Sequence, residues 1–153
     1  MDELLDIVND EDIVTDQQMR STVHQLGLQH RGVHVFLFTR DGKMLVQKRS
    51  ADRAASPSML DCSISEHVKA GESYLDAAMR GMKEEMGLNG IEIKPLVKFK
   101  MNYGINDNEI STLYEGVVDP AAVEFDPVEI EQIAYYSIDE IKGMMDEKSI
   151  FCG

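Results

Sequence analysis

EHVKAGESYLDAAMRGMKEEMGL, residues 66–88, is the stretch that decides the fold class. It predicts a helix over residues 73–86 that ends before Gly87, because glycine readily takes the left-handed conformation that closes a helix. The apolar residues that follow helical spacing, and that we expect to be buried, are Leu75, Ala78, Met79, Met82 and Met86.

A second face of this helix carries Gly81, Glu84 and Glu85, which are spaced i, i+3, i+4. Neighbouring carboxylates repel each other, and they are favoured together where a hard divalent cation such as Mg²⁺ binds them. The pair alone is more typical of an exposed helix surface. Gly81 is unexpected in this position, because glycine costs a helix about 1 kcal/mol relative to alanine.

The rest of the chain predicts strands and a few short helices. An apolar-turn-apolar pattern predicts a hairpin at residues 4–17, and a short helix is expected within residues 16–28. A final helix is predicted at residues 137–147, with Ser137 and Glu140 as its capping box. Further strands are predicted at residues 32–38, 43–49, 61–65, 91–104, 109–118 and 130–138, and residues 50–60 form a loop.

The first two of these strands are separated by Asp41-Gly42, a strong hairpin signal. One central helix among many strands predicts an α+β sandwich. A chain of 153 residues that is 43% hydrophobic has the size and the apolar content of one packed domain. We therefore expect a single domain over residues 1–153, in which residues 1–28 form a hairpin and a short helix before the core.

The charge and composition exclude several classes of function. A net charge of -13 argues against a nucleic-acid-binding surface, which requires basic residues. No apolar run approaches the roughly 20 residues of a membrane span, and the acidic start is unlike a signal peptide. Cys62 and Cys152 fit no metal-ligand spacing and no disulfide framework. These features predict a cytoplasmic protein that binds neither nucleic acid nor membrane.

The stretch from residue 66 to residue 88 resembles the Nudix box, G-x5-E-x7-R-E-U-x-E-E-x-G-U, where U is bulky and aliphatic. The residues that match are Glu72, Arg80, Met82, Glu84, Glu85, Gly87 and Leu88. The resemblance implies an α/β/α sandwich with a mixed central sheet around the Nudix helix. It also implies Mg²⁺-dependent hydrolysis, with Mn²⁺ as an alternative, of a nucleoside diphosphate-linked or other small diphosphate. A homodimer is compatible with it.

The same resemblance suggests roles for individual residues. Glu84 and Glu85 would bind the metal, together with Glu109, and Arg80 would orient a glutamate by bidentate pairing. Glu72 would make structural contacts around the loop of the box. Lys48, Arg49 and Arg53 are predicted phosphate contacts, and solvated charges at the end of a strand are the alternative of equal weight.

Two positions depart from the box. Glu66 stands where the box begins with glycine, and Gly81 stands where the family has a glutamate after the arginine. Either the site is impaired, which would leave a binding protein of Nudix fold, or Glu66 fills part of the vacated space. Glu66 is therefore a candidate catalytic residue. A glutamate introduced at position 81 is expected to restore the metal site and to favour the helix.

The flanks of the box resemble those of isopentenyl diphosphate isomerase, a Nudix-fold enzyme whose metal is held by three histidines and two glutamates. His30 and His67 match two of the histidines, and His24 lies one residue away from the third. Asp107 and Glu109 match the two glutamates. His30 and His67 are equally candidates for diphosphate or loop contacts, and His34 is expected to pack on the sheet.

The position of the isomerase's catalytic cysteine is occupied by Ser65, whose hydroxyl is a poor proton donor to an alkene. Cys62 lies three residues earlier, an odd separation that would place it on the opposite side of a regular strand. The sequence therefore favours a hydrolase of the isomerase-like branch, with the isomerase and the non-catalytic binding protein as alternatives.

Overall fold

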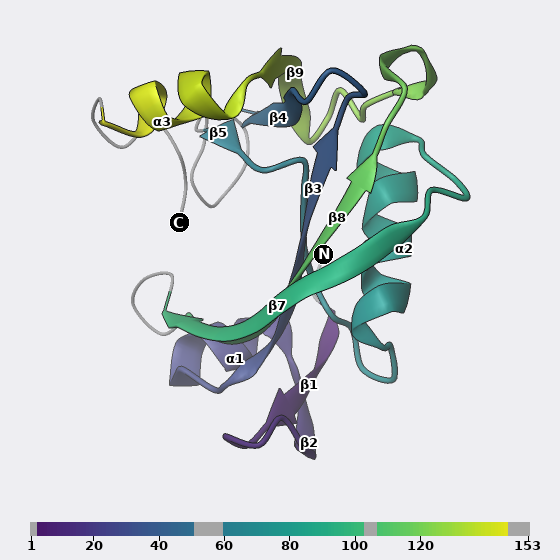
Figure 1. Ribbon diagram of the computed structural model, residues 1–153. Coiled ribbons are helices and arrows are strands. Elements are labelled where there is room, and N and C mark those ends of the chain that lie inside the picture. The colour runs from purple at the N-terminus through teal and green to yellow at the C-terminus, as the bar shows by residue number, and fades with distance from the viewer. Residues whose placement is uncertain (1–2, 51–59, 103–106, 147–153) are drawn as a thin grey trace.

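The computed structural model describes residues 3–50, 60–102 and 107–146 (Figure 1). The helices are α1 (Arg20–Leu26), α2 (Tyr74–Met86), α3 (Ile138–Asp146) and a 3-10 turn η1 (Pro120–Ala122). The strands are β1 (Leu4–Val8), β2 (Val14–Met19), β3 (His30–Phe38), β4 (Met44–Arg49), β5 (Leu60–Asp61), β6 (Ile64–His67), β7 (Ile93–Asn102), β8 (Asn108–Val117) and β9 (Ile130–Tyr136).

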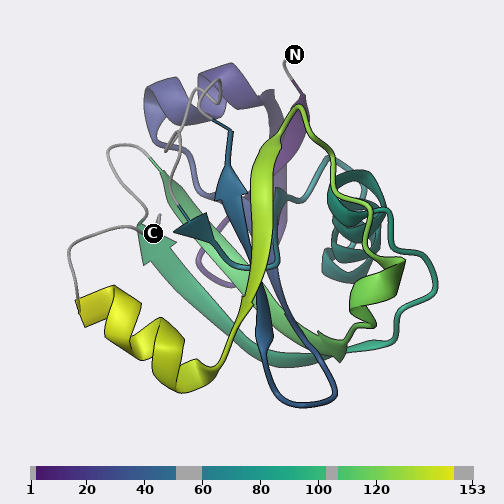
Figure 2. The ribbon, with the colours of Figure 1, turned by 90° about the horizontal axis from the view of Figure 1, so that it is seen from above.

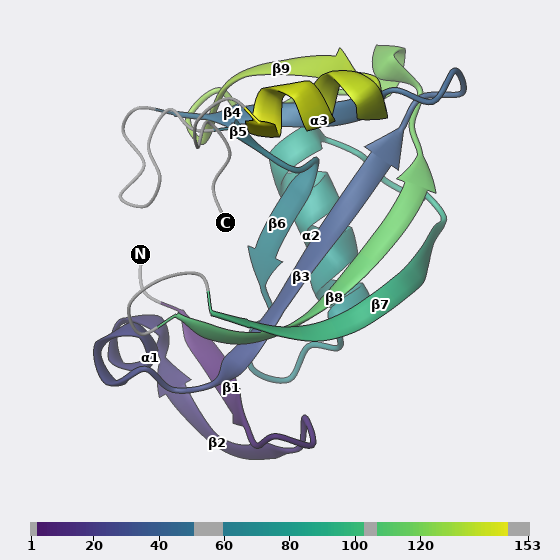
Figure 3. The ribbon, with the colours of Figure 1, turned by 60° about the vertical axis from the view of Figure 1, so that its left-hand side comes forward.

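Strand β3 is the centre of a mixed sheet. It runs parallel to β8 along its whole length, from the pair His30–Glu109 to the pair Phe38–Val117 (Figure 3). Along its other edge it pairs antiparallel with β1, β6 and β4 in turn. This register brings the start of β3 beside the start of β8, where the polar residues of both strands meet.

The turn at Asp41-Gly42 forms as predicted, but the hairpin that it was expected to close does not continue. Gly42 takes a positive φ of 85°, and β3 pairs with β4 only at Phe38 and Met44. Strand β6 occupies the edge of β3 that β4 would need, because Gly32 to Val35 pair with β6. Strand β4 instead leaves to pair with β5 and β9.

Ser63 lies where β3 and β4 separate. Its hydroxyl accepts a hydrogen bond from the Leu37 backbone N–H (2.9 Å) and donates one to the Leu45 carbonyl (2.6 Å). The side chain thus satisfies backbone groups that a regular ladder would have paired. The predicted strand at residues 61–65 is consequently two short strands, β5 and β6, with Cys62 and Ser63 between them.

Helices lie on both sides of the sheet, with α2 on one side and α3 on the other (Figure 2). Alternate residues of β3 explain this, because Val35 and Leu37 join the core under α2 while Phe36 and Phe38 pack near Ile141 of α3. Two details of the predicted stripe of α2 change. Leu75 is 47% exposed, and Ala77 is buried in its place, since the stripe follows the direction of the sheet.

Both predicted helix ends of α2 and the cap of α3 are confirmed. Ser73 caps α2 and forms a capping box with Asp76, and Gly87 ends the helix in the left-handed conformation. The Ser137 and Glu140 side chains form the corresponding box of α3. These caps fix α2 against the sheet, which determines where its carboxylates point.

Candidate functional site

Glu66 of β6 and Glu85 of α2 approach each other beside Gly81. Glu85 is buried, and its Oε1 accepts a hydrogen bond of 3.0 Å from Gln47 Nε2. No N–H or hydroxyl group among the described residues donates to its Oε2, and Glu85 interacts directly with the carboxyl of Glu66. A Cβ atom added at Gly81 would lie 2.9 Å from Glu66 Cγ and 3.4 Å from Glu85 Oε2. The Glu66 side chain therefore occupies the space that a side chain at position 81 would take.

The carboxyl groups of Glu66 and Glu85 together offer the oxygen ligands of a cation site. Burial and then the neighbouring Glu66 raise the pKa of Glu85 well above its usual range, and burial raises the pKa of Glu66. Two such carboxyls can both be ionised when a divalent cation binds them. A buried carboxylate oxygen that receives no N–H or hydroxyl among the described residues, beside a second carboxyl, is the donor set that Mg²⁺ prefers.

Glu84 is the least enclosed member of this face, and its side chain is 54% exposed. Its Oε2 lies 3.4 Å from Arg80 Nη1, and Glu66 Oε2 lies 3.6 Å from the same nitrogen. The helix thus directs Glu84 toward solvent and Glu85 into the protein.

Arg80 holds the loop of the box in place. Its guanidinium makes a bidentate contact with Glu72, through Nε (2.9 Å) and Nη2 (3.1 Å). Nη2 also donates to the His67 carbonyl at 2.9 Å. The glutamate that the structure pairs with Arg80 in bidentate geometry is thus Glu72, whose Oε1 accepts from the Lys69 N–H at 2.8 Å.

Three histidines and two carboxylates meet on the other face of β3 and β6. The ring centroids of His24, His30 and His67 lie 5.2–5.4 Å apart. His30 Nε2 lies 3.6 Å from both Asp107 Oδ1 and Glu109 Oε2. Their ligand atoms form two overlapping clusters, each within 4.8 Å. The resemblance to the isomerase predicted these five residues, and the structure brings them together.

Gly32 lets Glu109 lie across β3. A Cβ atom at Gly32 would be 1.5 Å from Glu109 Oε1, so no side chain fits there without moving that carboxylate. Glu109 had been predicted to share a metal with Glu84 and Glu85. The structure instead places it with the histidines, because it starts β8 beside His30 and points away from α2.

The histidine cluster also fits a divalent metal. His30 Nδ1 lies 3.1 Å from the Leu28 carbonyl, and this contact fixes the proton on Nδ1. His30 Nε2 faces the carboxylates of Asp107 and Glu109, each at 3.6 Å, and its lone pair can bind a metal when the ring is neutral. His67 Nδ1 lies 3.4 Å from Glu3 Oε1, an arrangement typical of metal-binding histidines.

Charges within the cluster influence one another. Burial lowers the pKa of His24. Burial also opposes the charge on His30, but its contacts with Glu109, the Leu28 carbonyl and Asp107 raise the pKa of His30 overall. Burial would raise the pKa of Glu109, yet the hydrogen bond with His30 and the nearby His67 lower it. The cluster thus balances positive and negative groups in a buried place.

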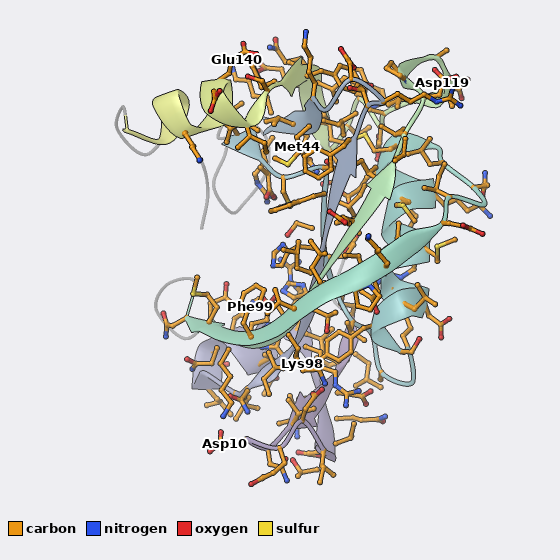
Figure 4. All side chains as sticks on the ribbon, in the orientation of Figure 1. Asp10, Met44, Lys98, Phe99, Asp119 and Glu140 are labelled. Atoms are coloured by element: carbon orange, nitrogen blue, oxygen red, sulfur yellow. The ribbon has the colours of Figure 1, made fainter. Side chains whose placement is uncertain are left out.

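Cys62 corrects an expectation from the sequence. Its Sγ lies 3.8 Å from His34 Nδ1, and His34 is paired across the strands with Ser65. Cys62 and Ser65 therefore face the same side, because the chain between β5 and β6 is not a regular strand. His34 packs on the sheet as predicted, stacked 6.3 Å from Phe99 of β7 (Figure 4).

Two of the predicted phosphate contacts have acidic partners. Lys48 Nζ lies 2.9 Å from Glu131 Oε2, and Arg49 Nη1 lies 3.4 Å from Asp61 Oδ2. Arg53 lies outside the described residues. Sequence reasoning missed Gln47 and Glu3, which hold Glu85 and His67. A glutamine within the apolar run of β4 was a usable signal, because a buried polar residue needs a partner.

Comparisons with known proteins agree on one family. Residues 28–151 match the model of the NUDIX domain. The chain is 34% identical to an uncharacterized Nudix hydrolase of Streptomyces coelicolor, over 95% of this chain and 81% of that protein. It is also 32% identical to an isopentenyl-diphosphate Delta-isomerase of Serratia proteamaculans, over 78% of this chain and 68% of that protein.

A solved structure is similar over nearly the whole chain. The crystal structure of DR0079 from Deinococcus radiodurans superposes with a TM-score of 0.84 at 25% identity, and covers 99% of this chain and 93% of that one. The predicted α+β fold with a mixed sheet is thereby confirmed. Within the described residues, no helix is long and apolar enough to cross a membrane.

Proposed function

Because the chain belongs to the Nudix family, we propose that it is a Mg²⁺-dependent hydrolase of a small diphosphate, with Mn²⁺ as an alternative metal. The observation that carries this proposal is the pair formed by Glu66 and Glu85. A buried carboxylate oxygen without an N–H or hydroxyl donor, next to a second carboxyl, is costly in a protein unless a cation or a proton joins the two groups. The substrate is nucleoside diphosphate-linked or another small diphosphate.

In this proposal each residue of the site has a separate role. Glu85 and Glu66 hold the metal, Glu84 lies at the exposed rim, and Gln47 fixes Glu85 through Oε1. Arg80 fixes the loop of the box through Glu72. A bound Mg²⁺ supplies charge neutralisation for the diphosphate and a more acidic water. Lys48, Arg49 and Arg53 are the phosphate contacts, and Lys48 and Arg49 would exchange Glu131 and Asp61 for substrate.

The reaction is a hydrolysis at phosphorus. The oxygen of water bonds to one phosphorus, the bond from that phosphorus to the bridging oxygen breaks, and the proton of the water goes to a carboxylate or to solvent. The substrate is a small molecule, and a net charge of -13 disfavours nucleic acid as a partner. The chain acts as a single domain, with a homodimer compatible with this chemistry.

The test is a panel of diphosphate compounds incubated with the protein and Mg²⁺ or Mn²⁺, with the phosphomonoester and phosphate products separated by ion-exchange chromatography as the readout. We expect turnover with either metal, loss of turnover with a chelator, and recovery when Mg²⁺ is returned. An exposed carboxylate variant, Glu92→Gln, is the matched control and should turn over as wild type. Absence of metal-dependent products across the panel would contradict hydrolysis and favour a binding protein of Nudix fold.

A second candidate function, isomerisation of isopentenyl diphosphate, is favoured by the histidine cluster with Asp107 and Glu109. It is disfavoured by Ser65 in the place of the catalytic cysteine. The discriminating measurement is exchange of the allylic protons of isopentenyl diphosphate in deuterated water. We expect none with the unmodified protein and a trace with Ser65→Cys. Strong exchange by the unmodified protein would reverse this ranking.

A further inference from the structure

Compared with the Nudix box, the residue types at positions 66 and 81 are exchanged in this chain. The Nudix box begins with glycine and has glutamate after its arginine, whereas this chain has Glu66 at the first place and Gly81 at the second. The structure adds what the sequence could not show, which is that the two positions are in direct contact. A Cβ atom at Gly81 would lie 2.9 Å from Glu66 Cγ.

The contact makes the two arrangements mutually exclusive. A side chain at position 81 would meet Ile64 Cγ2 as well, also at 2.9 Å. Ile64 is completely buried, so it has little room to move. With glutamate at position 66, a glutamate at position 81 would need the same volume. Only one of positions 66 and 81 can therefore place a side chain in this space between β6 and α2.

We propose that Glu66 supplies, from strand β6, the metal-binding carboxylate that the Nudix helix lacks at Gly81. This rests on the proposed hydrolase function. The independent observation is Glu85, whose side chain is buried and whose Oε2 receives no N–H or hydroxyl among the described residues and lies in the same space, 3.4 Å from the position of the missing Cβ. The glycine is therefore one half of an exchange that keeps the site working.

Arg80 is the positioning residue of this arrangement. Its Nη2 donates to the backbone carbonyl of His67, the residue after Glu66, at 2.9 Å. Its Nη1 lies 3.6 Å from Glu66 Oε2. The arginine thus contacts both the backbone of β6 and the carboxylate of Glu66, and so limits where that carboxylate can lie.

Mg²⁺ binding tests the exchange directly. Mg²⁺ prefers oxygen ligands, so it reports on the carboxylate group and not on the histidine cluster. The variants are Glu66→Gln, Gly81→Glu and the reciprocal double variant Glu66→Gly with Gly81→Glu, and Glu92→Gln is the control. Titration calorimetry gives the affinity for Mg²⁺, and the rise in melting temperature on adding Mg²⁺ gives a second readout. Hydrolysis of the diphosphate panel is measured in parallel.

Glu66→Gln should lose roughly tenfold or more in Mg²⁺ affinity, with a smaller rise in melting temperature. Gly81→Glu alone should be less stable than wild type and gain no affinity, since Glu66 still occupies the space. The reciprocal variant should regain most of the lost affinity. If crowding by Ile64 prevents it from folding, Ile64→Ala in the same background supplies the room.

Wild-type Mg²⁺ affinity in Glu66→Gln would overturn the exchange, and so would a reciprocal variant that binds no better than Glu66→Gln. Failure of the proposed function gives a different result. In that case wild type hydrolyses no compound of the panel, while the affinities for Mg²⁺ still fall and recover as the exchange requires. A wild type that binds no Mg²⁺ at all would overturn both.

Discussion

Glu66 and His67 are neighbours in β6 and point to opposite faces of the sheet. Glu66 lies against α2 beside Glu85, and the ring of His67 lies 5.2 Å from that of His30. The alternation of a strand produces this separation. One dipeptide therefore contributes to two candidate metal sites, an oxygen-rich one under the Nudix helix and a histidine-rich one on the far side.

Glu85→Gln is predicted to abolish hydrolysis. The amide keeps the size of the side chain but cannot supply the negative oxygen that a divalent cation requires, and we expect turnover to fall by about 10²-fold or more. Stability without metal should not fall, because the variant removes a charge from a buried place where Glu66 repels it. Steady-state kinetics and circular dichroism check both parts. Wild-type turnover in a folded variant would remove Glu85 from the mechanism.

His67→Ala is predicted to separate the two sites. It should lower the content of Zn²⁺ per protein, measured by elemental analysis after loading with Zn²⁺, while the affinity for Mg²⁺ stays within a few-fold of wild type. A ligand at 100 times its dissociation constant adds about 2.7 kcal/mol of stability, so the metal-loaded melting temperature should fall as well. The control is the exposed variant Glu92→Gln, which lies outside both sites. An unchanged metal content would remove the histidine cluster as a metal site.

Much of this fold could be predicted because its signals are local. The caps of α2 and α3, the turn at Gly42 and the alternation of β3 all depend on residues close in the chain. The pairing of β3 with β6 in place of β4 could not be predicted, because it depends on which strand reaches the edge of β3. The split at Ser63 has the same origin, since its partners Leu37 and Leu45 are distant in sequence.

The candidate sites, like the fold, could be predicted from the sequence only in part. The motif predicted that Glu84 and Glu85 lie side by side, but only the packing of α2 shows that one is exposed and the other buried. Of the two groups suggested for Glu109, the structure places it with the histidines and not with Glu84 and Glu85, because spacing along the chain does not say which face of a sheet a residue occupies. Gln47 and Glu3 act through contacts with residues far away in the sequence, so no motif contains them.

Asp12→Asn is predicted to lower stability near neutral pH. Asp12 accepts hydrogen bonds from Arg31 Nε (2.7 Å), Tyr74 Oη (2.9 Å) and Lys98 Nζ (2.5 Å), and so ties the first hairpin to β3, α2 and β7. Lys98 is labelled on β7 in Figure 4. Asparagine tolerates the positive φ of 61° at this position, so the substitution isolates the charge. We expect a loss of about 1.5 kcal/mol.

The pH dependence of this loss has a defined sign. Burial would raise the pKa of Asp12, but the hydrogen bonds from Lys98, Arg31 and Tyr74 outweigh it and lower the pKa below its usual range. A lowered pKa stabilises the fold above the unfolded value of about 3.9, and the contribution is lost as pH falls through the folded value. Urea unfolding at pH 7 and at pH 3 should therefore show a large and then a small difference between wild type and variant. An equal difference at both would contradict the assignment.

Gly81→Ala and Gly143→Ala together test why the central helix carries a glycine. Both glycines lie inside helices, where alanine is favoured by about 1 kcal/mol. Among the residues that the structure describes, a Cβ atom at Gly143 meets nothing within 4 Å, so this variant should show the full gain in the free energy of unfolding. At Gly81 the same methyl group meets Ile64 and Glu66 at 2.9 Å, and crowding of a packed core typically costs about 1–3 kcal/mol. The crowding therefore outweighs the helical preference, and Gly81→Ala should be less stable than wild type. The sequence predicts that a side chain at position 81 favours the helix, because helix propensity does not include the packing of β6 against that position. Chemical denaturation of the two variants decides the matter, since equal stabilisation by both would mean that β6 leaves room at position 81 and that Glu66 does not fill it.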